Sequence, residues 1–205
     1  MRIKLRTLPL VVAGAITLAL VPCRARAGAE LELISGSTDI IVPDNGLGDM
    51  STAAGQVLWV GSINGWSFTV NVGDTKPVLG SATAPQLDLS VTANSPGNGN
   101  LIIKFSDTGF GPTTGVINSS SFQNGTSSSS YDVLIDPNNT LFGGTSSTDA
   151  TLTGPYSITL VDTFTVGTIS SDHRASVPDG GATVALLGFA LVGVEGVRRK
   201  FVKKG

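Results

Sequence analysis

The sequence has few of the residues that carry most catalytic and redox chemistry. Among its 205 residues there is one cysteine, Cys23, and one histidine, His173. A single cysteine excludes an internal disulfide, and the two residues together cannot supply the three or four N or S ligands of the usual zinc sites. His173 lies in SSDHRAS, just before the C-terminal segment, where we expect an exposed linker residue and not a catalytic base. The composition therefore favours a protein that is not an enzyme.

Basic charge is also scarce through the middle of the chain. Residues 28–176 hold 13 acidic and 3 basic side chains, a net charge of 3 − 13 = −10. Binding to nucleic acid requires clustered Lys and Arg that neutralise phosphates, so this acidic body excludes a nucleic-acid partner. The other ten basic residues divide equally between the segment before residue 28 and the segment after residue 197.

The N-terminal basic cluster belongs to a signal-peptide pattern. MRIKLRT is a positive n-region, residues 8–21 are apolar, and Ala25 and Ala27 frame an A-x-A cleavage site. We expect a signal helix over 1–27 that engages the Sec translocon, with the mature chain starting at Gly28. Two weaker alternatives are a retained membrane helix, for which the apolar run falls short of ~20 residues, and a lipoprotein signal at Cys23, where Pro22 replaces the usual small residue.

The sequence pattern predicts that the body of the chain forms short strands. In GWSFTVNV, Trp66, Phe68, Val70 and Val72 occupy alternate positions and would share one face of a strand. The same period recurs in QLDLSVTA and LIIKFSD, which we predict to form a hairpin across SPGNGN, and in YSITLVDTFTV. These patterns predict an all-β fold: a single antiparallel β-sandwich, jelly-roll-like, over residues 28–170, flanked by the signal helix and a C-terminal apolar helix.

Several weaker ligand and catalytic patterns remain as alternatives. No cofactor is expected, although three loops gather oxygen ligands that calcium accepts: residues 43–49, 106–111 and 136–140. Four aromatic residues could stack on sugar rings, but their positions in apolar runs favour core packing; they are Trp59, Trp66, Tyr131 and Tyr156. Hydrolysis of a glycan would need two facing carboxylates, and no acid stands out as one with a raised pKa. A glycan- or calcium-binding surface module is the alternative function.

The C-terminal segment differs from everything before it. Residues 180–194 carry no charge, and a helix through these 15 residues would be ~22 Å long, short of a ~30 Å hydrocarbon core. Glu195 shortens the span, and a basic cluster follows it. We predict a linker with a short motif over 171–179, a marginal transmembrane helix over 180–197, and a basic cytoplasmic tail over 198–205. Arg198, Arg199 and Lys200 would act as the membrane stop.

A Val-Pro-Asp-Gly-Gly motif, an apolar helix and a terminal Arg/Lys cluster, in this order, resemble the PEP-CTERM class of exosortase sorting signals, and most closely its VPDSG variant. Val177, Pro178, Asp179 and Gly181 match the variant, whereas Gly180 replaces its serine. The resemblance implies export, transient retention in the inner membrane, cleavage near residues 177–181 by exosortase, and delivery to the cell surface or extracellular matrix. It also implies a structural protein of exopolysaccharide-producing, biofilm-forming bacteria, with exopolysaccharide as a further partner.

Overall fold

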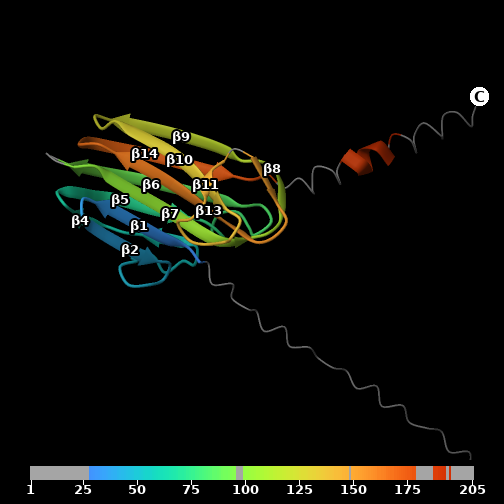
Figure 1. The fold of residues 1–205 in the computed structure, drawn as a ribbon, viewed down its shortest axis with the longest axis horizontal. Helices are drawn as coiled ribbons and strands as arrows, with labels where there is room; N and C mark the ends of the chain where they lie inside the picture. The colour runs from blue at the N-terminus through green and yellow to red at the C-terminus, as the bar shows by residue number, and fades with distance from the viewer. Residues whose placement is uncertain (1–27, 96–98, 148, 179–186, 193, 195–205) are drawn as a thin grey trace, which may run out of the picture.

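The protein folds into two antiparallel six-stranded sheets. The computed structural model describes residues 28–95, 99–147, 149–178, 187–192 and 194. Sheet A has the strand order β11-β10-β13-β7-β1-β2, and sheet B has the order β3-β5-β6-β14-β9, with β4 also paired to β5 (Figure 1). The all-β, antiparallel prediction is therefore confirmed, and the arrangement is sandwich-like.

Strand bounds are as follows. Sheet A contains β1 (Glu30–Ser35), β2 (Thr38–Pro43), β7 (Leu101–Phe110), β10 (Ser129–Asp136), β11 (Thr145–Ser146) and β13 (Tyr156–Phe164). Sheet B contains β3 (Gln56–Leu58), β4 (Gly61–Ile63), β5 (Trp66–Asp74), β6 (Gln86–Ser95), β9 (Asn118–Gly125) and β14 (Gly167–Ser176). A small separate pair joins β8 (Thr113–Val116) to β12 (Asp149–Leu152).

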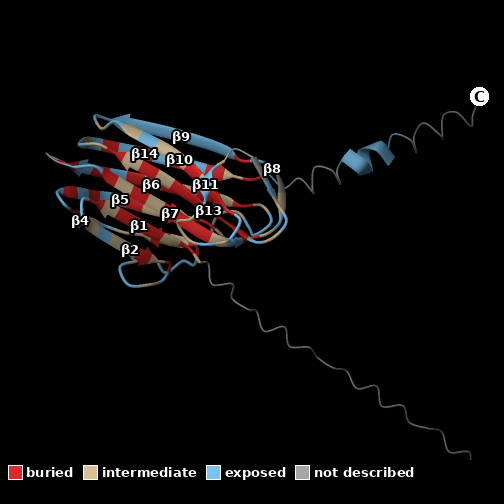
Figure 2. Cartoon of the chain, viewed as in Figure 1, coloured by how far each residue is buried: buried red, intermediate tan, exposed pale blue. Residues whose placement is uncertain are grey.

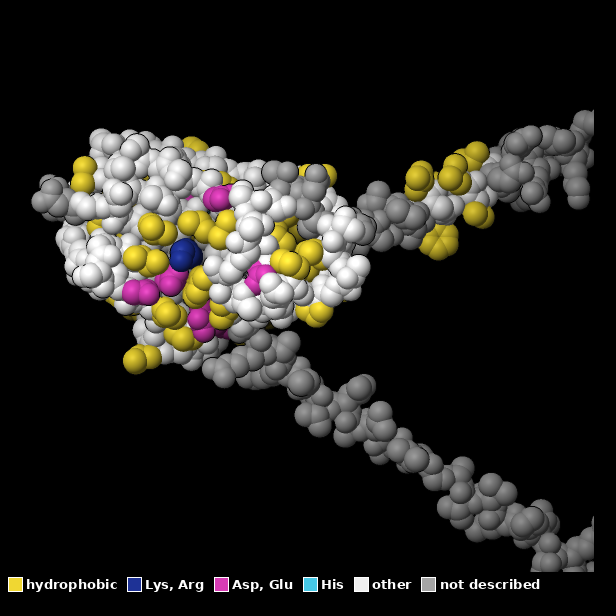
Figure 3. All heavy atoms as spheres, viewed as in Figure 1, with side chains coloured by type: hydrophobic (Ala, Val, Ile, Leu, Met, Phe, Trp, Pro, Cys, Tyr) yellow, Lys and Arg dark blue, Asp and Glu magenta, His cyan; other side chains and the backbone are white. Residues whose placement is uncertain are grey.

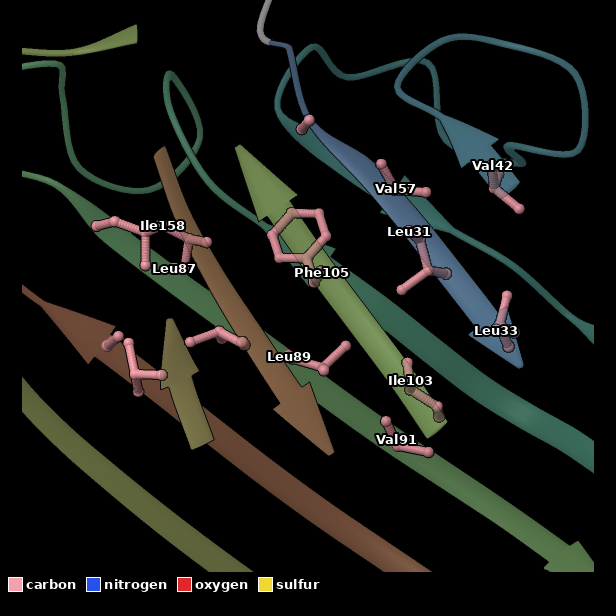
Figure 4. Close-up of a cluster of buried hydrophobic side chains, with 14 of the residues drawn as sticks. Leu31, Leu33, Val42, Val57, Leu87, Leu89, Val91, Ile103, Phe105 and Ile158 are labelled. Carbon is pink, nitrogen blue, oxygen red and sulfur yellow. The ribbon is translucent and has the colours of Figure 1, made fainter. Parts of the chain in front are cut away.

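One hydrophobic core lies between the two sheets. Leu31 and Leu33 of β1 and Leu87 and Leu89 of β6 are fully buried and come from opposite sheets (Figure 4). Every residue of this cluster lies between Ala29 and Val177. Burial of this apolar surface is the main favourable term in folding. Residues 28–178, which we call the β body, therefore hold the core that they need to fold on their own.

Most of the predicted strands are present, but the predicted hairpin between QLDLSVTA and LIIKFSD is wrong. The first stretch lies in β6 of sheet B and the second in β7 of sheet A. Both strands direct their alternate apolar residues into the common core, so each has the pattern of a hairpin partner although they belong to opposite layers. β7 pairs instead with β1 and β13, and β6 with β5 and β14.

The prediction for GWSFTVNV holds for only half of the strand. Trp66 and Phe68 are buried, but a register shift follows Phe68 in the pairing of β5 with β6. A bulge adds one residue to a strand and so moves every later side chain to the opposite face. Beyond it, Asn71 and Gly73 take the buried positions and Val72 is only partly buried.

The predicted boundary between sandwich and linker is also wrong. β14 continues to Ser176, so residues 171–176 belong to sheet B and not to a linker. In this strand Ile169, Ser171, His173 and Ala175 are buried while the residues between them are exposed. His173 is therefore an interior residue, which corrects the expectation of an exposed linker histidine.

Candidate functional site

The candidate site begins where β14 ends. Val177, the first residue of the VPDGG motif, is only 2% exposed, and its backbone N–H donates a hydrogen bond to the carbonyl oxygen of Pro85 at 3.0 Å. Pro178 is exposed. The β body is therefore held in place up to Val177, and Pro178 is the first exposed residue of the motif.

The rest of the predicted sorting apparatus is described only in part. Asp179, Gly180 and Gly181 of the motif, Arg198, Arg199 and Lys200 of the membrane stop, and Ala25 and Ala27 of the signal-cleavage site lie outside the described residues. Within the predicted C-terminal span, residues 187–192 and 194 are helical and exposed, and they include Leu187 and Phe189. Among the residues with a described structure, no helix has the length and apolar character needed to cross a membrane.

A buried ionisable pair lies between the sheets. His173 Nε2 on β14 is 3.2 Å from Asp162 Oδ1 on β13, and both side chains are 0% exposed. The ring of Tyr131 on β10 stacks on the imidazole at 4.4 Å between centroids. Gln123 Nε2 lies 3.5 Å from the same His173 Nε2. The only histidine of the chain is thus enclosed by side chains from both layers.

Burial determines the protonation of this pair. It raises the pKa of Asp162 to about 8 and lowers the pKa of His173 to about 4, because a charge without water is costly in the interior. In a Ser-His-Asp triad the carboxylate binds one imidazole nitrogen and the nucleophile the other. Here Asp162 and Gln123 both lie at Nε2, and Nδ1 has no hydrogen-bond partner among the described residues. The arrangement is that of a pair enclosed in the core, without the two-sided hydrogen bonding of a triad histidine.

Two carboxylates do approach each other on the outer face of sheet B. Burial, followed by a hydrogen bond to Asp172, raises the pKa of Asp88 to about 6, and Arg174 also pairs with Asp88. Glycosidases hold their two carboxyl groups about 5 Å or more apart, with the scissile bond between them. The Arg174 guanidinium pairs with Asp88 Oδ2, so one of the two carboxylates is already engaged with a cation of the protein itself.

The acids of the three candidate calcium loops bind groups of the protein itself. Asp49 accepts hydrogen bonds from the backbone N–H groups of Asn45, Ser51 and Leu58 at 2.8–2.9 Å. Asp44 accepts one from the N–H of Gly55 at 3.0 Å. These bonds use the carboxylate oxygens to fix the turn that spans residues 43–49.

In the other two candidate calcium loops, the carboxylates also bind donors of the protein itself. Asp107 is fully buried and bonds Lys76 Nζ at 2.6 Å, Thr75 Oγ1 at 2.8 Å and the N–H of Thr108 at 2.7 Å. Hydrogen bonds from Thr140 and Asn138 hold the pKa of Asp136 below its usual value. Across the described ranges there is no cluster of three or more His, Cys, Asp or Glu side chains placed to hold a metal ion.

The aromatic side chains pack as the sequence predicts. Trp66 and Tyr156 are fully buried, and Trp59 and Tyr131 are partly buried against the core. Trp59 also contacts Phe68 edge-on at 5.2 Å. Core packing accounts for all four residues.

Sequence reasoning missed β14 and the Asp162–His173 pair. The signal was present in ISSDHRASV, where Ile169, Ala175 and Val177 alternate with polar residues in the period of a half-buried strand. The two other inward positions of this strand hold Ser171 and His173. Because both residues are polar, the alternation of apolar residues is interrupted and the strand is hard to recognise.

The comparisons with known proteins concern the segment that begins at the end of β14. A family model described as the VPDSG-CTERM motif matches residues 176–201. No curated protein and no solved structure matches the chain. The motif indicates an exported protein that is sorted through the membrane and processed there by exosortase. The chain thus carries, directly after the last strand of its β body, a C-terminal exosortase-sorting signal of the VPDSG-CTERM type.

Proposed function

We propose that the protein is a structural component of the cell surface or extracellular matrix, released by exosortase and without catalytic activity. The observation that carries the proposal is the position of the sorting motif. The match to the family model starts at Ser176, and among the described residues Val177 is the last one packed on the β body. Cleavage on the tail side of Val177 would leave the whole core intact.

The flanking segments complete this proposal. The β body, which we interpret as a jelly-roll-like sandwich, would lie between a signal helix at 1–27, inserted through the Sec translocon, and a transmembrane helix at 180–197. The basic cluster at 198–205 would keep the tail end in the cytoplasm, by the positive-inside rule. Biofilm matrix is the expected destination, with exopolysaccharide as the expected neighbour.

A role without catalysis is supported by the histidine and carboxylate side chains, which are buried or bound to other groups of the protein. His173 is enclosed between the sheets, Asp88 pairs with Arg174, and the loop carboxylates accept hydrogen bonds from the protein's own donors. The face shown in Figure 3 consists mostly of uncharged polar side chains and backbone, with hydrophobic side chains and a few acidic ones near a small basic area.

The intact mass of the mature protein tests the proposal. The full chain would be produced in a strain with a functional exosortase and in a matched strain without it. We expect a product that starts at Gly28 and ends within residues 177–181 in the first strain only. An Asp179→Asn variant, altered in the motif, should keep its tail in both strains. A wild-type product that still carries Arg198 in the exosortase-positive strain would contradict the proposal.

A further inference from the structure

The edge strand β9 is exposed along its whole length. All eight of its residues are exposed, and Figure 2 shows the strand in pale blue at the rim of the molecule. One side of β9 pairs with β14 in regular register, from Asn118 opposite Ser176 to Gly125 opposite Ile169. No described strand pairs with its other side. Alternate residues of an edge strand direct their N–H and C=O groups outward, so about four residues of β9 offer unpaired backbone groups.

The other three edges of the two sheets are short or protected. β11 has two residues and β3 has three, whereas β2 carries Asp39 and ends at Pro43. Short length, charge and proline are the devices by which proteins prevent edge-to-edge pairing. The sequence of β9, NSSSFQNG, contains no charge and no proline, and its pairing with β14 shows no bulge.

The charge distribution makes this edge the place where two copies can approach. Residues 28–176 have a net charge of −10, so two β bodies repel each other over most of their surface. Residues 108–131, which include all of β9, carry no charged side chain. On β14, Asp172 lies opposite Phe122 and Arg174 lies opposite Ser120, and their charges are of opposite sign.

The side chains of β9 also permit close approach. Ser119, Ser121 and Gln123 share a face with the buried residues of β14, and Phe122 projects from the opposite face with 64% of its surface exposed. Small serines leave the backbone accessible, and a large exposed phenylalanine gains by burial against a partner.

We propose that β9 pairs antiparallel with β9 of a second copy, so that two sheets B form one continuous sheet. Antiparallel pairing of a strand with its own copy follows a twofold axis, which closes the assembly as a dimer. It satisfies the outward backbone groups of both copies and removes both unprotected edges. The dimer is independent of the proposed sorting, because every residue that makes it lies in the β body.

Sedimentation of the purified β body tests the association. We expect a concentration-dependent dimer that Ser120→Lys and Phe122→Lys weaken at least about tenfold in Kd, because each places two like charges at the twofold contact. Thr92→Lys is the matched control: it adds the same charge to an exposed position on the central strand β6 and should leave the dimer unchanged. A β body that stays monomeric, or a dimer that tolerates both β9 variants, would overturn the proposal.

Cysteine scanning tests the register, because the β body has no cysteine of its own. Ser120→Cys, Phe122→Cys and Asn124→Cys would be oxidised separately, with Thr92→Cys as the control. A disulfide requires Cβ atoms about 4 Å apart, so a twofold axis across β9 should give one position of greatest cross-linking and a decline away from it. Equal cross-linking at every β9 position, or equal cross-linking at Thr92→Cys, would contradict the antiparallel pair.

Discussion

The backbone N–H of Val177 donates a hydrogen bond to the carbonyl oxygen of Pro85, at a distance of 3.0 Å. This bond continues the line of β14 by one residue beyond the strand and fixes the first residue of the sorting motif to the body. Of the two motif residues that the structure describes, Val177 is therefore packed on the body and Pro178 is exposed.

Val177→Ala should lower the free energy of unfolding of the β body by about 1–2 kcal/mol, because it removes two buried methyl groups from the core. Urea unfolding of the purified β body measures this loss. Val166→Ala is the matched control: Val166 is 46% exposed, and the same change there should cost much less. Equal losses in the two variants would show that Val177 is not packed on the body.

The Asp162–His173 pair should make stability fall as pH rises above neutrality. When folded, the pair holds one proton between pH values of about 4 and about 8, whichever residue carries it. In the unfolded chain, the pair holds one proton between pH 3.8 and pH 6.5, the ordinary pKa values of the two residues, and no proton above pH 6.5. The pair's contribution is therefore level up to 6.5 and then declines through the raised pKa of Asp162, by on the order of 2 kcal/mol.

Asp162→Asn is the control for this prediction. In this variant His173 is the one member of the pair that still titrates. Between pH 6.5 and about pH 4 its imidazole is protonated in the unfolded state but not in the folded state, because burial lowers its pKa. The decline on the alkaline side should disappear, and a decline on the acid side should replace it. Urea unfolding of both proteins across this pH range measures the difference. An alkaline decline that persists in Asp162→Asn would show that other groups cause it.

Gly73→Ala should destabilise the β body by about 1–3 kcal/mol, because a Cβ on β5 would overlap the ring of Phe105 from the opposite sheet. Gly154→Ala is the matched control, since among the described residues only its chain neighbours would lie within 4 Å of the added Cβ. Thermal unfolding of the two variants compares them directly. A Gly73→Ala protein as stable as Gly154→Ala would mean that Phe105 does not pack on this glycine.

Lys76→Met should cost about 3 kcal/mol, because it leaves the buried carboxylate of Asp107 without its cation. The same substitution in an Asp107→Asn background should cost far less, since no buried charge remains to be compensated. The coupling between the two changes is obtained from urea unfolding of the four proteins. Additive losses would contradict a direct ion pair.

The sequence predicts the all-β class because its apolar residues alternate along strands with a half-buried face. Leu87, Leu89 and Val91 satisfy this rule and are all buried. Alternation identifies which residues of a strand face inward, but it does not identify the neighbouring strand. This is why β6 and β7 have the pattern of a hairpin although they lie in opposite sheets.

The interior polar residues could not be predicted in the same way. The bulge after Phe68 places Asn71 inside, and no residue of GWSFTVNV indicates it. His173 follows the alternation of β14, but a histidine is ordinarily read as a surface residue. Its partner Asp162 lies on β13, which belongs to the opposite sheet, and the alternation within one strand does not identify a contact across the core. The sorting motif, by contrast, is a contiguous signal and needed no knowledge of the fold.

β14 is an interior strand that leads directly into the tail. It is held along its entire length by β6, and from Ile169 to Ser176 by β9. Tension on the tail would act along the strand axis. It would load these hydrogen bonds in shear, all at the same time, whereas a force across the strand would break them one after another. With the tail anchored as proposed, the sheet would resist forces that pull on it until exosortase cuts the chain, and a partner strand on β9 would increase that mechanical resistance.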